Sequence, residues 1–102
     1  MKTYIKKDVV ERTAEKTGLE TKETARVVNA VFTALRELMI EKDTECRIEI
    51  RNFGVFEVKR TAAKPKARNP KKPDQIIYIP PRRKTLFRPG KMLKVFLRKP
   101  LE

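Results

Sequence analysis

Residues 60–73 read RTAAKPKARNPKKP, and this stretch decides the fold because it contains no large apolar side chain. Such a segment cannot pack into a hydrophobic core. Residues 74–81 follow as DQIIYIPP, whose isoleucines and tyrosine have strong strand propensity. The pattern predicts a β-ribbon over residues 60–81 that leaves the body and turns near residues 69–72. About eight residues per limb, at roughly 3.3 Å each, give a reach of about 25 Å. A disordered basic loop in the unbound protein is the alternative.

The charged residues are divided unevenly along the chain. Residues 1–58 contain 11 basic and 11 acidic side chains, whereas residues 59–102 contain 15 basic and two acidic ones, Asp74 and Glu102. The whole net charge of +13 therefore lies in the C-terminal part. A neutral first half joined to a strongly cationic second half indicates a polyanionic partner.

Two helices are predicted in the neutral half. The first covers residues 4–17, with Thr3 as its N-cap and Gly18 as a left-handed stop. The second covers residues 22–42, with Thr21 as its N-cap. Its apolar residues recur three and four positions apart, and they form a stripe too wide for one short partner helix. A second burial surface is therefore indicated.

Beyond residue 45 the apolar period changes to two. Cys46, Ile48 and Ile50 alternate with charged residues, which is typical of a strand with one buried face. Residues 52–54, Asn-Phe-Gly, predict a tight turn because asparagine and glycine tolerate positive φ, and residues 55–59 return as a second strand. A third strand is expected over residues 84–87. A short helix should follow to about residue 99, with Pro89 near its first turn. The fold class is α+β.

The composition excludes several classes of function. The chain has 102 residues and no histidine, and Cys46 is its single cysteine, so a disulfide within the chain or a thiol cluster for a metal is ruled out. No apolar run approaches the roughly 20 residues of a membrane span, and residues 1–8 lack the apolar core of a signal peptide. No motif pairs a nucleophile with a general base. We expect a single cytoplasmic domain that is not an enzyme and that needs no cofactor, metal, small-molecule substrate or membrane.

Three motifs in register resemble the HU/integration host factor family, the dimeric histone-like DNA-bending proteins of bacteria. They are Asn52-Phe53-Gly54-Val55-Phe56 at the predicted turn, Arg68-Asn69-Pro70 at the arm tip, and Phe87-Arg88-Pro89-Gly90-Lys91-Met92-Leu93-Lys94 before the last helix. The resemblance covers nearly the whole chain. Residues 87–91 look closer to integration host factor subunits than to typical HU.

The resemblance implies an intertwined dimer whose two β-ribbon arms reach around double-stranded DNA. Residues 1–44 would form a helical dimerisation region, and residues 45–59 and 82–102 the sheet and C-terminal helix of the body. Residues 60–81 would form the DNA-embracing arm. A homodimer associated with the nucleoid is expected, with a heterodimer as the alternative.

Pro70 is the candidate bending residue. Its flat apolar ring has no backbone N–H and can wedge between base pairs from the minor groove, although an ordinary turn proline is the alternative. Arg68 and Asn69 are candidates for minor-groove contacts, because arginine is attracted to a narrow groove and asparagine can bond to adenine N3 or thymine O2. Pro73, where the family usually continues with threonine and glycine, must change the geometry of the turn.

Cations along the arm and the body are candidates for phosphate contacts, joined by a glycine at a helix N-terminus. These candidates are Lys59, Arg60, Lys64, Lys66, Lys71, Lys72, Arg82, Arg83, Lys84, Arg88, Gly90, Lys91 and Lys94. The aromatic residues are instead assigned to the core, because they alternate with aliphatic ones. These are Phe53, Phe56, Phe87 and Phe96.

The predicted function is an architectural one: binding double-stranded DNA through the minor groove, bending it by proline intercalation and compacting or shaping the nucleoid. A site-selective bending protein of the integration host factor type is one alternative. An RNA-binding protein of ribosomal type is another, because such proteins share the small size, the high charge and the basic extensions.

Overall fold

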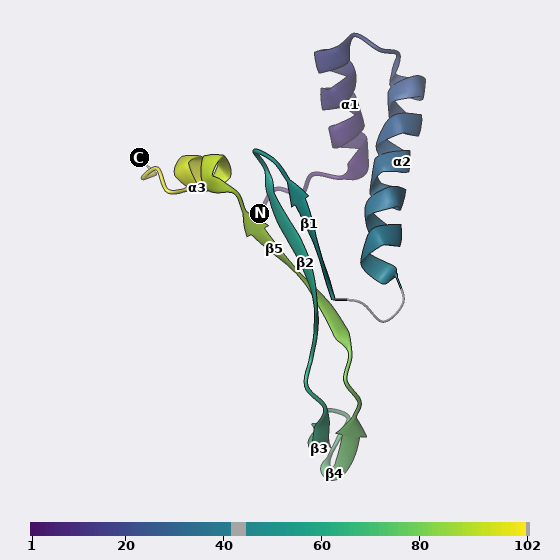
Figure 1. Ribbon diagram of the computed structural model, residues 1–102, viewed down its shortest axis with the longest axis vertical. Coiled ribbons are helices and arrows are strands. Elements are labelled where there is room, and N and C mark those ends of the chain that lie inside the picture. The colour runs from purple at the N-terminus through teal and green to yellow at the C-terminus, as the bar shows by residue number, and fades with distance from the viewer. Residues whose placement is uncertain (42–44, 102) are drawn as a thin grey trace. The chain divides into compact units, whose positions relative to one another are not determined.

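The computed structural model describes residues 1–41 and 45–101 as two compact units, a helical one within residues 1–42 and a second one within residues 43–102. The helical unit consists of α1, Lys6–Thr17, and α2, Thr21–Ile40. The second unit contains five strands and a short helix (Figure 1). The α+β class is therefore confirmed.

Local interactions set the ends of the two long helices. The N-cap of α1 is Ile5 rather than the expected Thr3, and the backbone N–H of Ile5 donates to Oδ2 of Asp8 at 2.7 Å. This is the carboxylate half of a capping box. Gly18 ends the helix with φ 74°, as predicted. Thr21 is the first residue of α2 and not its cap, because Glu20 holds the extended N-cap conformation. The helix α2 ends at Ile40 rather than at the expected residue 42, because Glu41 has left the helical conformation.

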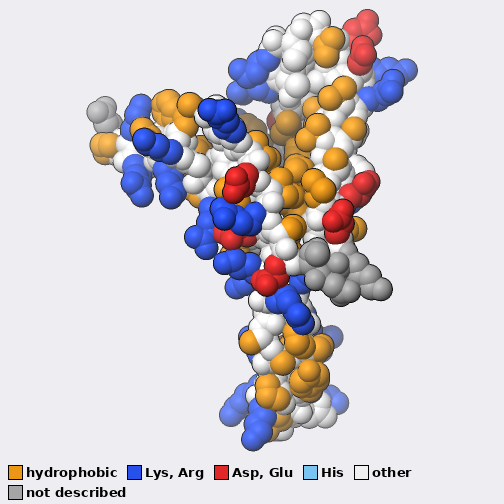
Figure 2. All heavy atoms as spheres, in the orientation of Figure 1, with side chains coloured by type: hydrophobic (Ala, Val, Ile, Leu, Met, Phe, Trp, Pro, Cys, Tyr) orange, Lys and Arg blue, Asp and Glu red, His pale blue; other side chains and the backbone are white. Residues whose placement is uncertain are grey.

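Few side chains are buried within the helical unit. Val10 of α1 and Val28 of α2 are buried, and so is Thr24, whose hydroxyl donates to the carbonyl of Glu20 at 2.9 Å. Val31, Phe32 and Leu38 of the apolar stripe of α2 are exposed, whereas Leu35 and Met39 are half-buried. Figure 2 shows hydrophobic side chains along the length of α2.

The second unit contains a three-stranded antiparallel sheet in the order β1-β2-β5. Its strands are β1, Cys46–Ile50, β2, Gly54–Arg60, and β5, Arg83–Pro89. Phe56 lies opposite Ile48 on one side and Phe87 on the other, so these three share one face of the sheet. The opposite face carries Glu57, with Arg47 and Leu86 on the neighbouring strands, together with Val55 and further charged residues. The sheet therefore has one apolar face and one largely charged face.

The β1–β2 connection depends on two residues with different roles. Asn52 takes φ 66°, as predicted for the turn. The expectation of positive φ at Gly54 is wrong, since Gly54 is the first residue of β2. Gly54 is needed for space instead: a Cβ atom there would lie 2.5 Å from the carbonyl oxygen of Arg88 and 2.7 Å from the Phe87 ring.

Three of the four phenylalanines assigned to the core contact one another, although Phe53 and Phe87 are 46% and 41% exposed in the single chain and only Phe56 is half-buried. Phe53, Phe56 and Phe87 form a tilted cluster with ring centroids 4.9 to 6.4 Å apart. The prediction of a buried Phe96 is wrong for the single chain. This residue lies on α3, Lys91–Leu97, which buries none of its residues, and the Phe96 side chain is 59% exposed. The apolar side chains of α3 lack a covering surface within the described chain.

The predicted ribbon is formed by β3, Lys64–Asn69, and β4, Lys72–Ile79, which pair antiparallel as a separate two-stranded sheet (Figure 1). Its register shifts between Lys64 and Ala67 and again between Arg68 and Asn69. Pro65 lies within the first shift and Pro73 opposite the second. Proline cannot donate to a ladder, so within sheets it is confined to edges and bulges.

Candidate nucleic-acid interface

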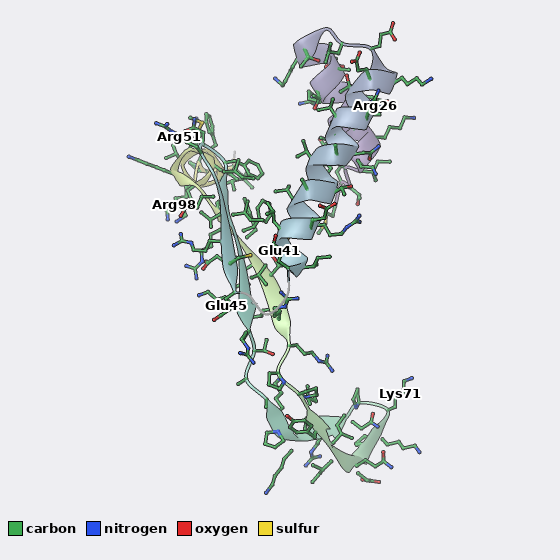
Figure 3. All side chains as sticks on the ribbon, turned by 45° about the vertical axis from the view of Figure 1, so that its right-hand side comes forward. Arg26, Glu41, Glu45, Arg51, Lys71 and Arg98 are labelled. Atoms are coloured by element: carbon green, nitrogen blue, oxygen red, sulfur yellow. The ribbon has the colours of Figure 1, made fainter. Side chains whose placement is uncertain are left out.

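The tip of the arm is a turn that exposes Pro70. Asn69 pairs with Lys72, so Pro70 and Lys71 are the two residues between the strands. The backbone N–H of Lys71 donates to Oδ1 of Asn69 at 3.0 Å, which is an Asx turn. Lys71 lies at the far end of the hairpin in Figure 3. Pro70 is exposed in this turn, with Arg68 and Asn69 before it and lysines after it.

Pro73 lies in an irregular part of the tip. The register moves from Arg68↔Ile76 directly to Asn69↔Lys72, so residues 73–75 form a bulge on β4. The first of the two turn residues is Pro70, whose ring fixes φ near −65° and so excludes the primed turns that match strand twist. Across the hairpin, Nδ2 of Asn69 lies 3.5 Å from Oε1 of Gln75.

The limbs of the arm have two different faces. Ala67 and Ile77 lie opposite each other and are half-buried, so the ribbon does possess a small apolar face, contrary to expectation. The other face carries Arg68 and exposes Ile76 and Tyr78, at 67% and 61%. Sequence reasoning overlooked these two exposed apolar side chains. Successive side chains of a strand point to opposite faces, so the sequence QIIYI of residues 75–79 could have placed Ile76 and Tyr78 together on one face.

The base of the arm brings like charges together. Lys59 lies opposite Lys84 and Arg60 opposite Arg83 in the β2–β5 ladder. Directly opposite like charges destabilise a sheet by themselves, so this arrangement favours an anionic partner. Just beyond the ladder, the Thr61 N–H donates to the Arg82 carbonyl at 2.7 Å, and the Arg82 N–H donates to the Thr61 hydroxyl at 3.0 Å. These bonds hold the two limbs together where they leave the sheet.

Two of the predicted phosphate ligands already have a partner. Glu57, 7% exposed on the central strand, forms an ion pair with Nε of Arg88, and its Oε2 lies 3.6 Å from Nζ of Lys59. On the central strand, Glu57 lies between Arg47 of β1 and Leu86 of β5, which are its partners in the two ladders. The cluster of Glu57, Lys59 and Arg88 carries a net charge of +1 rather than +2.

The helix N-terminus contributes less than expected. Gly90 is the N-cap of α3, but its backbone N–H donates to the Phe53 carbonyl at 2.8 Å. This amide is therefore not available to a phosphate, and the assignment of Gly90 is wrong in this respect. Pro89 is the last residue of β5 and lies before the first turn rather than in it. Lys91 and Lys94 remain exposed on α3.

The other predicted cations are exposed on the same unit. Figure 2 shows basic side chains over the sheet, over α3 and at the far end of the arm. Those on the arm and its base are Arg60, Lys64, Lys66, Arg68, Lys71, Lys72, Arg82, Arg83 and Lys84. Within the described residues, no group of three histidine, cysteine, aspartate or glutamate side chains could hold a metal ion. No described helix is long and apolar enough to cross a membrane.

Comparison with known proteins places this arrangement in a family. The family model described as bacterial DNA-binding protein matches residues 4–98. DNA-binding protein HU of Geobacillus stearothermophilus is 35% identical over 89 residues, covering 87% of this chain and 93% of that protein. Integration host factor subunit alpha of Myxococcus xanthus is 38% identical over 89 residues, covering 87% of this chain and 65% of that one.

A solved structure agrees with these relatives. The fold is similar to that of HU in an Anabaena HU–DNA cocrystal structure, with a TM-score of 0.80 and 27% identity, covering 95% of this chain and 100% of that one. The similarity includes helices, sheet and arm, because nearly the whole of both chains is matched. This chain belongs to the HU/integration host factor family of bacterial DNA-binding proteins.

Proposed function

We propose that this protein is an architectural DNA-binding protein that grips double-stranded DNA through the minor groove and bends it with its arm. The observation that carries the proposal is the exposed Pro70 at the turn of a basic ribbon, in a chain of this family. The solved relative was crystallised with DNA. The family consists of structural proteins and not of enzymes, and family membership also argues against the ribosomal alternative.

The bend follows from the chemistry of the tip. The Pro70 ring enters a base step from the minor groove and unstacks it, which costs a few kcal/mol. The bent duplex then reaches more of the cationic surface, and those contacts offset the cost. Arg68 and Asn69 contact the groove beside the wedge, while lysines along the limbs neutralise phosphates. Sequence preference would be limited to A·T against G·C, because the minor groove has a degenerate pattern.

A second copy of the chain completes the core in this proposal. Among the described residues, only Val10, Val28 and Val58 are apolar and buried, which is too small a core for a stable chain. The uncovered apolar side chains of α2 and α3 offer the missing area. They are Val27, Val31, Phe32, Leu38, Ile40, Met92, Val95, Phe96 and Leu97. We propose a homodimer with two arms. The alternative is a heterodimer with a related subunit.

The division of labour and the location in the cell belong to the same proposal. Residues 1–44 serve dimerisation, residues 45–59 and 82–102 form the body, and residues 60–81 embrace DNA. A protein that binds chromosomal DNA without strong sequence preference resides at the nucleoid, in the cytoplasm of a bacterial cell. It shapes or compacts the DNA there and uses neither a cofactor nor a small-molecule substrate.

The test replaces one proline of the arm at a time. Pro70→Ala should reduce the bend, measured by energy transfer between the ends of a duplex, more than it reduces affinity. Pro73→Ala is the matched control, because it also removes an arm proline but from the bulge rather than the turn. An unchanged bend in Pro70→Ala would remove the wedge from the proposal. Absence of duplex binding by the unaltered protein would refute the function itself.

A further inference from the structure

We propose that Gln75 is a positioning residue that makes the arm tip selective for A·T pairs beside Pro70. It acts by accepting from Nδ2 of Asn69, a second bond that holds the Asn69 amide in the orientation set by the Lys71 backbone N–H. The proposal rests on the proposed function, since it concerns how the tip reads the minor groove. It adds a residue that the sequence did not single out.

The orientation of the Asn69 amide is determined by the groups around it. The Lys71 backbone N–H can only donate, so the side-chain atom of Asn69 that it meets at 3.0 Å must be the oxygen Oδ1. The nitrogen Nδ2 then faces Gln75. Because Nδ2 is a donor, the atom of Gln75 at 3.5 Å must be its oxygen Oε1. One backbone donor therefore sets both amides.

This chain of bonds leaves a donor at the tip. One hydrogen of Asn69 Nδ2 is directed to Gln75, and the second faces no acceptor within the described part of the arm. Asn69 is itself half-buried in the ribbon and lies directly before the wedge residue. A groove held open by Pro70 would therefore meet an N–H group of Asn69.

An amide fixed as a donor distinguishes base pairs in the minor groove. An A·T pair presents only acceptors there, adenine N3 and thymine O2, whereas a G·C pair adds the N2 amino donor of guanine. The Asn69 N–H can donate to the acceptors of an A·T pair, but at a G·C pair it meets the guanine amino group, which is another donor. If the amide rotated freely, its oxygen could accept from the guanine amino group and the preference would disappear.

The Gln75 contact is kept across the bulge. In a regular ladder continuing from Arg68↔Ile76, Gln75 would lie directly opposite Asn69, but here the register jumps and Asn69 pairs with Lys72. The two side-chain amides still lie within reach of each other, with Nδ2 of Asn69 3.5 Å from Oε1 of Gln75. Gln75 is exposed, so its substitution should change the fold of the arm little.

The experiment compares nicked duplexes that differ only in the base pairs beside the nick, which fixes where Pro70 inserts. These pairs are A·T, G·C or inosine·C, and inosine lacks the amino group of guanine. The unaltered protein should prefer A·T and inosine·C over G·C by roughly two- to tenfold, the range of one net hydrogen bond. Asn69→Ala should bring this ratio close to one, and Gln75→Met should lower it measurably, because the Asn69 amide is then held by the Lys71 N–H alone.

Two further variants separate positioning from direct contact. Gln75→Glu keeps an acceptor for Asn69, so it should retain the ratio while its negative charge weakens binding to all three duplexes. Gln75→Met should change nothing more when Asn69 is already alanine. A Gln75→Met protein with the original ratio would overturn the inference, as would a Gln75→Glu protein that loses it. In either case intact binding and bending would leave the proposed function standing.

Discussion

Replacing Glu57 by glutamine should strengthen the electrostatic part of DNA binding. Glu57 is buried on β2 and holds Arg88 and Lys59, two cations on the charged face of the sheet. Removing one partner of a buried ion pair costs about 3–5 kcal/mol. This figure must be lowered here, because the Lys59 and Arg88 side chains are 46% and 64% exposed and are screened by solvent. Because the Glu57 carboxylate is buried, its ion pairs with Lys59 and Arg88 are nevertheless expected to persist.

The size of the effect follows from counterion release. The logarithm of the binding constant falls against the logarithm of the salt concentration with a slope of about −0.9 for each phosphate neutralised. Glu57→Gln frees up to two cations, so the slope should become steeper by about 0.9 for each one that reaches a phosphate. Binding at low salt should tighten accordingly. The amide keeps the shape of the side chain, so the melting temperature should change little.

Fluorescence anisotropy of a labelled duplex, titrated at several salt concentrations, measures this slope. Glu49→Gln is the matched control, because Glu49 pairs with Arg47 at 3.4 Å and both side chains are exposed. An exposed pair opens readily, so Arg47 is already available to a phosphate and the slope should stay near its original value. Equal slopes for the two variants would refute the role of burial. A flat salt titration of the unaltered protein would refute the electrostatic account as a whole.

Three further predictions concern stability. Gly54→Ala should destabilise the sheet by about 1–3 kcal/mol, because the new methyl group would overlap the Phe87 ring and the Arg88 backbone. Urea unfolding measures this change in the free energy of unfolding. A change as small as that of a surface substitution would contradict the prediction. Asp8→Ala should cost about 0.5–2 kcal/mol by leaving the Ile5 N–H without its cap, read from thermal unfolding with Glu11→Ala as control. Dilution should lower the melting temperature if the core is shared between two chains, and a temperature independent of concentration would argue for a stable monomer.

The elements themselves could be predicted because each has a local pattern. The apolar spacing of α2, the alternation around Ile48 and the absence of large apolar residues in the arm each have one structural solution. The helix caps were less predictable from residue type. Thr3 and Thr21 are good capping residues, yet the extended N-cap conformation falls on Ile5 and Glu20. At Ile5 the backbone N–H is satisfied by Asp8, three residues later, and at Glu20 the backbone carbonyl accepts from Thr24 in the first turn of the helix.

The candidate site was predicted where it depends on local sequence and missed where it depends on pairing. The tip motif could be recognised from three consecutive residues. Glu57 could not be identified as the partner of Arg88, because the two meet only when β2 pairs with β5. The same holds for Gly54, which is required by the Phe87 ring rather than by its own φ. Gln75 could be identified only from its contact with Asn69 across the hairpin.

The arm contains prolines, which weaken a sheet, and lysines, which suit a polyanionic partner. A two-stranded ribbon is marginally stable in water, and both of its outer edges are open to pairing with another strand. Pro65 and Pro73 remove donors from those edges, and the exposed lysines repel a second ribbon. These features prevent the arm from pairing with a copy of itself. In the proposed complex, a DNA groove would supply phosphates for the lysines and a base step for Pro70, which are partners that the ribbon lacks within its own chain.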